Sequence, residues 1–289
     1  MQDSISIPTK TSTATPLIHL PEIDKMLYVK VEYENPVAAM KFRAIPPFFE
    51  HLLNIGEIKK GDKVAMRSAG SAAVAMAWIT VRLGLHPIAV LPPVAPAPIV
   101  RMLRWLGAEV HIVKPDEAKK MMAAYQEDDS VYVFGQAGEH RLVDLYGNVG
   151  VEIFEQLPEV AAVTVGIGTG ISVTGIARAL KRLSPTAKVY GCEPEESPVA
   201  SQGKWGPHKI PGLAPPIAQP LLDKSIIEDI VLVPSDRAWE RAKDLAHGFG
   251  IMAGPSSGCT LDAALQLRAR GVEGPIVAIL ACSIGEYLD

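Results

Sequence analysis

The sequence predicts an α/β protein with mainly parallel sheets that are covered by helices on both faces. Short apolar runs alternate with longer helical patterns along most of the chain, and this alternation is typical of parallel sheets. The runs are continuous stretches of Val, Ile and Ala, the composition of strands that are buried on both faces. With 289 residues, the chain is long for one hydrophobic core and sufficient for two.

Eight runs are predicted strands, because each is a short apolar block next to turn residues. They are residues 63–66, 87–91, 110–113, 131–134, 162–165, 188–191, 230–233 and 276–280. Six segments with apolar residues at helical spacing are predicted helices. They are residues 72–83, 98–106, 116–126, 172–183, 236–249 and 260–270. Residues 92–98 and 202–220 are rich in Pro and Gly and are predicted loops.

The composition excludes several classes of function. A formal net charge of −4, with no block of Lys and Arg, argues against a nucleic-acid partner. No apolar run reaches the roughly 18 residues of a membrane span, and the N-terminus lacks a signal pattern. The three cysteines have neither metal-ligand nor disulfide spacing, so we expect no metal site and reduced thiols in the cytoplasm.

A glycine-rich turn between a predicted strand and a predicted helix is the strongest local signal. Gly168, Thr169, Gly170 and Ser172 fall at the start of the helix, where free N–H groups and the helix dipole favour a phosphate. The dinucleotide pattern fails because its third glycine is replaced by Ile171, and the Gly-Lys-Ser/Thr of a Walker loop is missing. From the residues alone, a monophosphate cradle and a plain turn both remain open.

Two further turns precede predicted helices. The amides and hydroxyls of residues 68–71 could hold a carboxylate, or one of the serines could simply cap the helix. Ser256 and Ser257 leave the same two alternatives open. Since the carboxyl ends of parallel strands lie along one edge of a sheet, we expect the three turns to converge there.

A single lysine, Lys41, stands among apolar neighbours in the segment NPVAAMKFRA. Such a lysine either extends its ammonium group to water or is a buried amine with a lowered pKa that forms a Schiff base. Pro46 and Pro47 follow it closely, and we expect them to interrupt or kink the helix that carries Lys41.

In their order and spacing these segments resemble cysteine synthases, fold-type II pyridoxal-phosphate enzymes of the tryptophan-synthase-β superfamily. The likeness rests on Asn-Pro with Lys41, the turn at 68–71, Gly-Thr-Gly with Ser172, and Gly-Pro-Ser-Ser-Gly. It extends from residues 14–20 through 206–212 to the C-terminal ILACSIGEYL. The resemblance implies two three-layer αβα domains, residues 1–147 and 148–289, with residues 14–34 packing on the second.

The resemblance also implies roles for single residues. Lys41 matches the lysine that forms the internal aldimine with pyridoxal 5'-phosphate, and Ser256 matches the serine at the pyridine nitrogen. The remaining residues matched to cofactor contacts are Ser71, Gly168, Thr169, Gly170 and Ser172. The residues matched to the substrate carboxylate are Ser68, Ala69, Gly70, Ser71, Ala72 and Gln136.

By this resemblance the protein is a cytoplasmic, homodimeric transferase of amino-acid biosynthesis. Its reaction would be β-replacement on an O-activated serine through an aminoacrylate, with a small nucleophile as second substrate. A neutral hydroxyl at Ser256 cannot hold the ring nitrogen firmly protonated, and this favours elimination at Cβ over transamination. Because Ser71 and Ala72 stand where the family has Asn and Thr, we expect an altered substrate specificity.

Three other interpretations remain open. A lyase would stop at β-elimination, as a dehydratase or desulfhydrase does. A pseudoenzyme would keep the fold as a binding partner; the altered turn at 68–72 motivates this interpretation, and the retained Lys41, Thr169 and Ser256 weigh against it. A nicotinamide-dependent dehydrogenase has Glu193 after the next predicted strand in its favour, and the missing third glycine against it.

Overall fold

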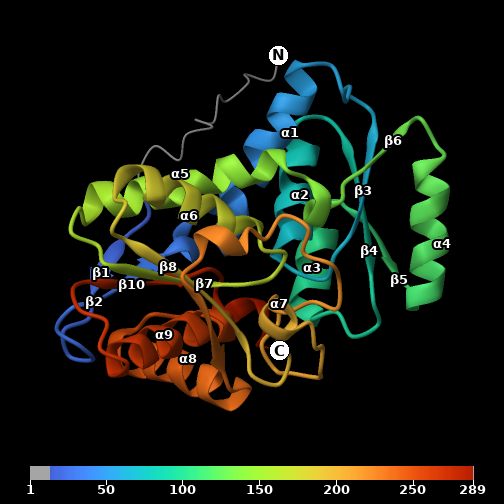
Figure 1. Ribbon diagram of the computed structural model, residues 1–289. Helices are drawn as coiled ribbons and strands as arrows, with labels where there is room; N and C mark the ends of the chain where they lie inside the picture. Colours follow the sequence, from blue (N-terminus) through green and yellow to red (C-terminus); the bar gives the residue numbers. More distant parts are fainter. Residues whose placement is uncertain (1–13, 289) are drawn as a thin grey trace.

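The computed structural model describes residues 14–288 and contains two sheets (Figure 1). The larger sheet has the order β1-β2-β10-β7-β8-β9, with β1 (Leu17–His19), β2 (Leu27–Val31), β7 (Ala162–Gly166), β8 (Lys188–Pro194), β9 (Asp229–Val233) and β10 (Ile276–Leu280). The smaller sheet has the order β5-β4-β3-β6, with β3 (Lys63–Arg67), β4 (His86–Leu91), β5 (Glu109–Ile112) and β6 (Val131–Val133). Every pairing is parallel except β1 with β2, so the predicted class is confirmed.

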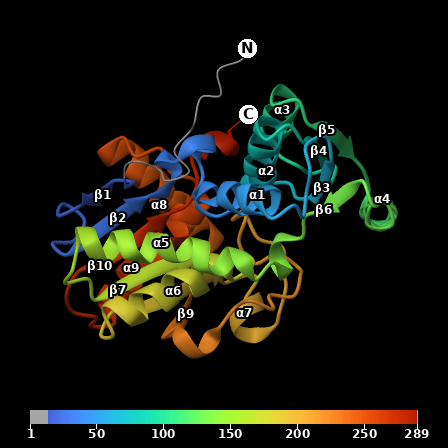
Figure 2. The same cartoon turned by 90° about the horizontal axis from the view of Figure 1, so that it is seen from above.

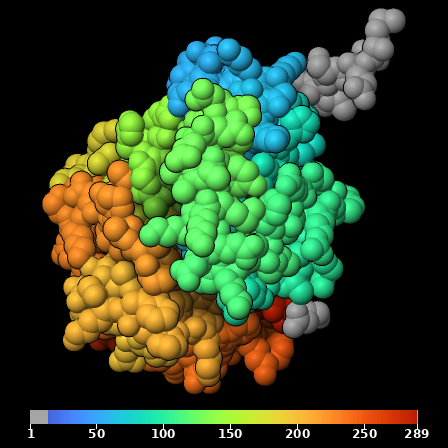
Figure 3. Space-filling view, turned by 90° about the vertical axis from the view of Figure 1, so that its right-hand side faces the viewer, coloured from blue at the N-terminus to red at the C-terminus, as the bar shows by residue number. Residues whose placement is uncertain are grey.

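Helices cover both faces of each sheet. They are α1 (Ile45–Asn54), α2 (Ser71–Arg82), α3 (Ala97–Trp105), α4 (Pro115–Gln126), α5 (Arg141–Gln156), α6 (Ile171–Leu183), α7 (Val199–Gln202), α8 (Ser235–Phe249) and α9 (Pro255–Ala269). In Figures 1 and 2, α5 and α6 lie on one face of the larger sheet, and α8 and α9 on the other. The smaller sheet has α1, α2 and α3 on one face and α4 on the other; α4 faces the viewer, in green, in Figure 3.

The eight predicted strands are all present, and β1 and β2 are the two that the sequence analysis missed. β1 is three residues long, and β2 contains Lys30, whose charge conceals a strand that is almost wholly buried. β2 pairs with β10, which is the last strand of the chain. The N-terminal segment therefore completes the sheet that is built mainly from the C-terminal half.

The six predicted helices are also present, while α1, α5 and α7 were not predicted. Gly147 and Gly150 lie at the expected division between the two domains, and in the structure they are the places where α5 packs closely against α6. A Cβ atom on Gly150 would lie 2.9 Å from the carbonyl oxygen of Ile176. The expected division between residues 147 and 148 falls inside this continuous helix.

The expectation that Pro46 and Pro47 interrupt the helix carrying Lys41 is wrong. Lys41 lies in a separate 3₁₀ turn, Met40–Arg43, and α1 begins after it at Ile45. Pro46 and Pro47 occupy the first turn of α1, where the missing N–H has no helical acceptor and the fixed φ suits the helix. The prolines thus start a helix instead of breaking one.

A buried, charge-balanced network fixes the Lys41 turn to the larger sheet. The Arg43 guanidinium lies 2.8 Å from the Glu32 carboxylate and 2.5 Å from Glu152 of α5. Lys30 of β2 lies 2.8 Å from the same Glu152. Removing one partner from such a network typically costs about 3–5 kcal/mol, because a buried charge is left uncompensated.

Within residues 14–288, no helix combines the length and apolar character that crossing a bilayer requires.

The close contact between α5 and α6 gives a test of this packing. A Cβ on Gly175 would overlap the carbonyl oxygen of Val143, which is backbone and cannot rotate away. We expect Gly175→Ala to lower the free energy of unfolding by about 1–3 kcal/mol. Gly248→Ala is the matched control: this exposed helical position is open, and alanine there should be neutral or stabilise by up to about 1 kcal/mol. Urea denaturation measures the free energy of unfolding of both variants. A Gly175→Ala chain as stable as the wild type would contradict the close packing of α5 on α6.

Candidate active site

Three helix N-termini and the ends of three strands meet between the two sheets. Strand β7 leads into α6, the end of β10 lies beside the start of α9, and β3 leads into α2. A narrow cavity lies among them and is lined by Lys41, Ser71, Gly168, Thr169, Ser172, Ser256 and Cys282, among others. It adjoins an open cleft of about 650 Å³ that shares Lys41, Ser71, Gly168 and Thr169 with it. Sites at the carboxyl ends of parallel strands are the rule in open α/β sheets.

The amine of Lys41 lies inside this cavity, and its Nζ atom is 5.7 Å from the centre of the Tyr146 ring. Burial lowers the pKa of Lys41 from its usual 10.5 to about 8, while the nearby acidic groups of Cys282 and Glu286 oppose that shift. An appreciable fraction of the amine is therefore neutral, and able to attack a carbonyl, near neutral pH. Lys41 is half-buried and also lines the open cleft, and its lowered pKa favours the amine of a Schiff base over an ammonium group extended to bulk water.

The glycine turn forms a cradle at the N-terminus of α6. A Cβ on Gly168 would lie 2.6 Å from the carbonyl oxygen of Gly212, so this backbone approaches its neighbour as only glycine allows. Gly170 has a φ of +83° and is the N-cap of α6; no side chain within residues 14–288 caps it by a hydrogen bond. The first amides of α6 are free to bind an anion. The Gln136 amide donates to the Thr169 hydroxyl at 3.2 Å, which links the two sides of the cleft.

Ser256 stands in the first turn of α9, and its hydroxyl lies 3.1 Å from the sulfur of Cys282. The thiol is buried, and burial raises its pKa to about 12, so Cys282 is neutral at physiological pH. Ser257, the neighbouring serine, donates to the Cys282 carbonyl at 3.4 Å and is a structural group. Ser256 thus keeps a neutral hydroxyl at the cavity wall.

The start of α2 forms one wall of the open cleft. The N-cap of α2 is Gly70, and within the described part of the chain no side chain caps this end by a hydrogen bond. Lys41 and Arg67 are the charged residues among those that line the cleft, and none of the described lining residues is acidic. Free amides with nearby positive charge are suited to the carboxylate of an amino acid.

The structure brings the predicted site residues together. Gln136 and residues 68–72 line the open cleft, and Lys41, Ser71, Gly168, Thr169, Ser172 and Ser256 line the narrow cavity. Gly170 lines neither and shapes the turn. Their individual roles toward a ligand stay predictions. The sequence analysis assigned no role to Tyr146, Cys282, Glu286 or Tyr287; the last three belong to the motif ILACSIGEYL, which was the available signal.

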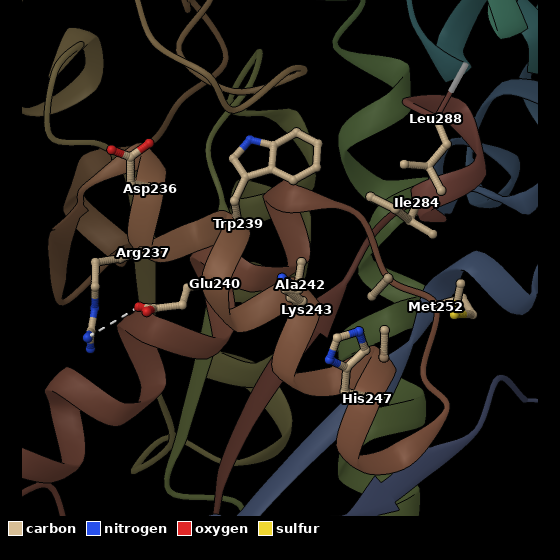
Figure 4. A pocket seen from close by; sticks show the side chains of 12 residues that line it. Asp236, Arg237, Trp239, Glu240, Ala242, Lys243, His247, Met252, Ile284 and Leu288 are labelled. Atoms are coloured by element: carbon tan, nitrogen blue, oxygen red, sulfur yellow. Dashed lines mark ion pairs between the residues drawn. The ribbon is translucent and has the colours of Figure 1, made fainter.

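A separate cavity of about 620 Å³ lies on the outer side of α8 and does not share lining residues with the Lys41 cavity. Figure 4 shows Trp239 of α8, Met252, Ile284 and Leu288 around it. The turn at the C-terminal end thus contributes Ile284 and Leu288 to this outer cavity, and Tyr287 to the Lys41 cavity.

The residues of the narrow cavity fit pyridoxal phosphate. Pyridoxal phosphate has a phosphate, an aldehyde and a ring nitrogen. The cavity offers one matching group for each: the glycine cradle for the phosphate, the amine of Lys41 for the aldehyde, and the neutral hydroxyl of Ser256 for the ring nitrogen. A side chain at Gly168 would meet the Gly212 carbonyl, and one at Gly170 would meet Leu222, so the close packing of this chain requires glycine at both positions of the cradle. We infer that these groups hold the phosphate, the aldehyde carbon and the ring nitrogen, respectively.

Comparisons with known proteins agree with this fit. The family model described as pyridoxal-phosphate dependent enzyme matches residues 9–282. A cysteine synthase of Staphylococcus aureus is 30% identical over 91% of this chain and 87% of its own length, and cysteine synthase 3 of Caenorhabditis elegans is 32% identical over 89% and 80%. The structure of O-ureido-L-serine synthase superposes with a TM-score of 0.90 at 25% identity, covering 97% of this chain and 92% of its own. A hydrogen sulfide-producing enzyme of Fusobacterium nucleatum gives 0.89 at 27%, covering 95% and 96%.

The cradle can be tested by adding one methyl group. We expect Gly168→Ala to weaken binding of pyridoxal phosphate at least ~10-fold, equivalent to about 1.4 kcal/mol, because the Gly212 carbonyl must move away from the new Cβ. Titration followed by the visible absorbance of the bound cofactor measures the dissociation constant. Gly138→Ala, at an open position in the wall of the same cleft, is the control and should bind normally. Unchanged affinity in Gly168→Ala would place the phosphate elsewhere.

Proposed function

The chain belongs to the family of pyridoxal-phosphate-dependent enzymes, and from that premise we propose that it is a transferase for β-replacement on an O-activated serine. The observation that carries the proposal is the meeting of a buried amine, Lys41, with the glycine cradle in one cavity. The similarity to cysteine synthases over most of the chain supports the reaction type. The same resemblance supports a homodimer in the cytoplasm, and size-exclusion chromatography with light scattering tests the dimer.

The cofactor, when bound, supplies an electron sink for the bonds at the Cα atom of an amino acid. The residues of this chain bind, orient and move protons around it. Nζ of Lys41, with a pKa of about 8, takes the Cα proton as general base. The hydroxyl of Ser256 donates a hydrogen bond to the ring nitrogen without supplying a positive charge there. The free amides at the start of α2 hold the substrate carboxylate.

The substrate-facing positions support a specificity that differs from housekeeping cysteine synthesis. At Ser71, one hydroxyl replaces the two amide donors of the Asn that the resemblance leads one to expect, and Ala72 has no polar group. Both residues line the cleft. The structures with similar folds include enzymes named for different products, an O-ureido-L-serine synthase and a hydrogen sulfide producer. The donor, the nucleophile or both are therefore proposed to be other than O-acetylserine and sulfide.

Replacing the amine is the direct test of catalysis. We expect Lys41→Ala to lower kcat by roughly 10²–10⁴-fold, the usual contribution of a general base, and to abolish the visible absorbance of the lysine-bound cofactor. Lys181→Ala, an exposed lysine on α6, should retain both. Steady-state assays with absorbance spectra measure the two effects. If the wild-type chain, with Lys41 intact, does not bind pyridoxal phosphate, the pseudoenzyme interpretation is supported instead.

A panel of O-activated serines separates the remaining alternatives. We expect at least one donor other than O-acetylserine to change the cofactor spectrum and to give a new amino acid when a nucleophile is added. O-acetylserine with sulfide is expected to react poorly, with kcat/KM below the usual range of roughly 10⁴–10⁸ M⁻¹s⁻¹. Mass spectrometry of the product reads the outcome. Pyruvate and ammonia in the presence of every nucleophile would identify a lyase.

A further inference from the structure

The open cleft beside Lys41 is larger than the chemistry described so far requires. Its volume is about 650 Å³, and pockets that bind small organic molecules measure roughly 300–1,000 Å³. A nucleophile of the size of a water molecule fills only about 30 Å³. Besides the donor amino acid, the cleft therefore has room for an acceptor with several carbon atoms.

Arg67 lines this open cleft but not the narrow cavity that contains Lys41. It is the last residue of β3, and because side chains alternate along a strand, it points to the same face of the sheet as Ala65. Ala65 packs in one cluster with Ala118 of α4. Arg67 is therefore on the α4 side of the smaller sheet (Figure 1).

The Lys41 turn lies on the other side of the same sheet. The ring of Phe42, next to Lys41, lies 5.2 Å from the ring of Trp78 on α2, measured between centroids. Met122 and Val133, which pack against the cluster on the α4 side, also line the open cleft and do not line the narrow cavity. The cleft thus extends from the Lys41 cavity past the end of β3 to the α4 side.

The positive charge of Arg67 is not balanced by another residue of the described chain. Within residues 14–288 its guanidinium makes no hydrogen bond or ion pair, and none of the described residues that line the cleft is acidic. By contrast, Arg141 of α5 is paired with Glu57 and Glu139. A guanidinium group binds a carboxylate through two parallel hydrogen bonds. Arg67 is therefore available to bind an anionic group of a ligand.

Apolar side chains form much of the wall near this guanidinium group. Val94 and Ile217 line the cleft and are 87% and 47% exposed. Pockets that bind organic molecules combine such apolar walls with a few polar groups that fix orientation. The cleft is thus suited to a hydrocarbon segment that ends in an anion.

The donor amino acid leaves the Arg67 end of the cleft to the acceptor. In the proposed function the amides at the start of α2 hold the donor carboxylate, and the reacting Cβ lies at the Lys41 amine. The leaving group is bonded to that Cβ and is lost there. The acceptor reaches Cβ through the open cleft, so its remaining atoms extend toward the α4 side.

We propose that Arg67 is a specificity-determining residue that binds a carboxylate on the acceptor, so that the second substrate is an organic acid with a nucleophilic thiol or amine. The leaving group departs from Cβ with its bonding electron pair, and the sulfur or nitrogen of the acceptor supplies the pair of the new bond. The proton that the acceptor loses balances the charge of the leaving group. This inference rests on the proposed function and names the class of its second substrate.

Two thiols test the proposal on the cofactor-loaded, full-length chain. Mercaptoacetate carries a carboxylate where 2-mercaptoethanol carries a hydroxymethyl group. With the donor of the serine panel that reacts best, kcat/KM is measured for each thiol at equal thiolate concentration. We expect the wild type to prefer mercaptoacetate by roughly 10–100-fold, the effect of charge-assisted hydrogen bonds to one carboxylate. Arg67→Gln should remove most of this preference.

Two variants serve as comparisons. Arg67→Lys keeps the charge without the planar guanidinium, and it should retain part of the preference. Arg182→Gln is the matched control, because this exposed arginine in the last turn of α6 does not line the cleft. Its preference should equal that of the wild type.

Three outcomes of these assays would overturn the proposal. The first is an equal preference in the wild type and in Arg67→Gln. The second is a loss in Arg67→Gln that is the same with both thiols, which would assign Arg67 to the carboxylate of the donor. The third is a loss confined to O-phosphoserine when it is compared with O-acetylserine as donor, which would place the anion on the leaving group.

A binding measurement keeps a failure of this proposal distinct from a failure of the proposed function, and it decides the matter if no donor reacts. Isothermal titration calorimetry of the cofactor-loaded chain compares glutarate with pentanoate, which has one carboxylate fewer. We expect glutarate to bind at least ~10-fold more tightly, and Arg67→Gln to remove the difference. That result in a chain that turns over no donor would support the anion site and contradict β-replacement. Turnover without a preference for mercaptoacetate would support β-replacement and contradict the acidic acceptor.

Discussion

The end of strand β10 holds the two halves of the site together. The carbonyl of Ala281 accepts from Met40 at 2.8 Å, and the carbonyl of Cys282 accepts from Gly254 at 2.9 Å. These two bonds fix the turn with Lys41 and the turn with Ser256 to the same strand end, although the residues are far apart in the sequence. β10 lies inside its sheet between β2 and β7, so its own position is set from both sides. The distance between amine and hydroxyl therefore depends on sheet pairing and not on either turn alone.

Helix N-termini contribute free backbone amides to the site. Amides at the starts of α2 and α6 have no side-chain caps among the described residues, and the turns before them contain glycine. Such ends bind anions by hydrogen bonds and by the helix dipole without placing further lysines in the cavity. Positive charge among the lining residues is confined to Lys41 and Arg67. Backbone amides carry no net charge. The protonation of Lys41 therefore depends on the groups that lie next to its amine and not on the anion sites.

Backbone strain is concentrated beside this site. The non-glycine residues with positive φ within residues 14–288 are Val37 and Ala38, next to the Lys41 turn, and Ala214. The amide of Ala214 donates to the carbonyl of Ile167 in the glycine turn, at 2.9 Å. Each such conformation costs about 1–3 kcal/mol and persists where the surroundings impose it. Here the buried network of Arg43, Glu32 and Glu152 and the pairing with β10 hold the Lys41 segment in place.

The residue pattern was enough to predict the α/β class and the eight main strands, and it singled out the glycine turn and Lys41 without settling the role of either. These features are local: hydrophobic runs, turn glycines and a charge among apolar neighbours are each visible within a few residues. The pairing of β1 with β2 and of β2 with β10, and the close contact of Gly147 and Gly150 of α5 with α6, appear only in the tertiary structure. These outcomes depend on strand pairing and helix contacts between distant segments, and no local pattern encodes a distance across the fold.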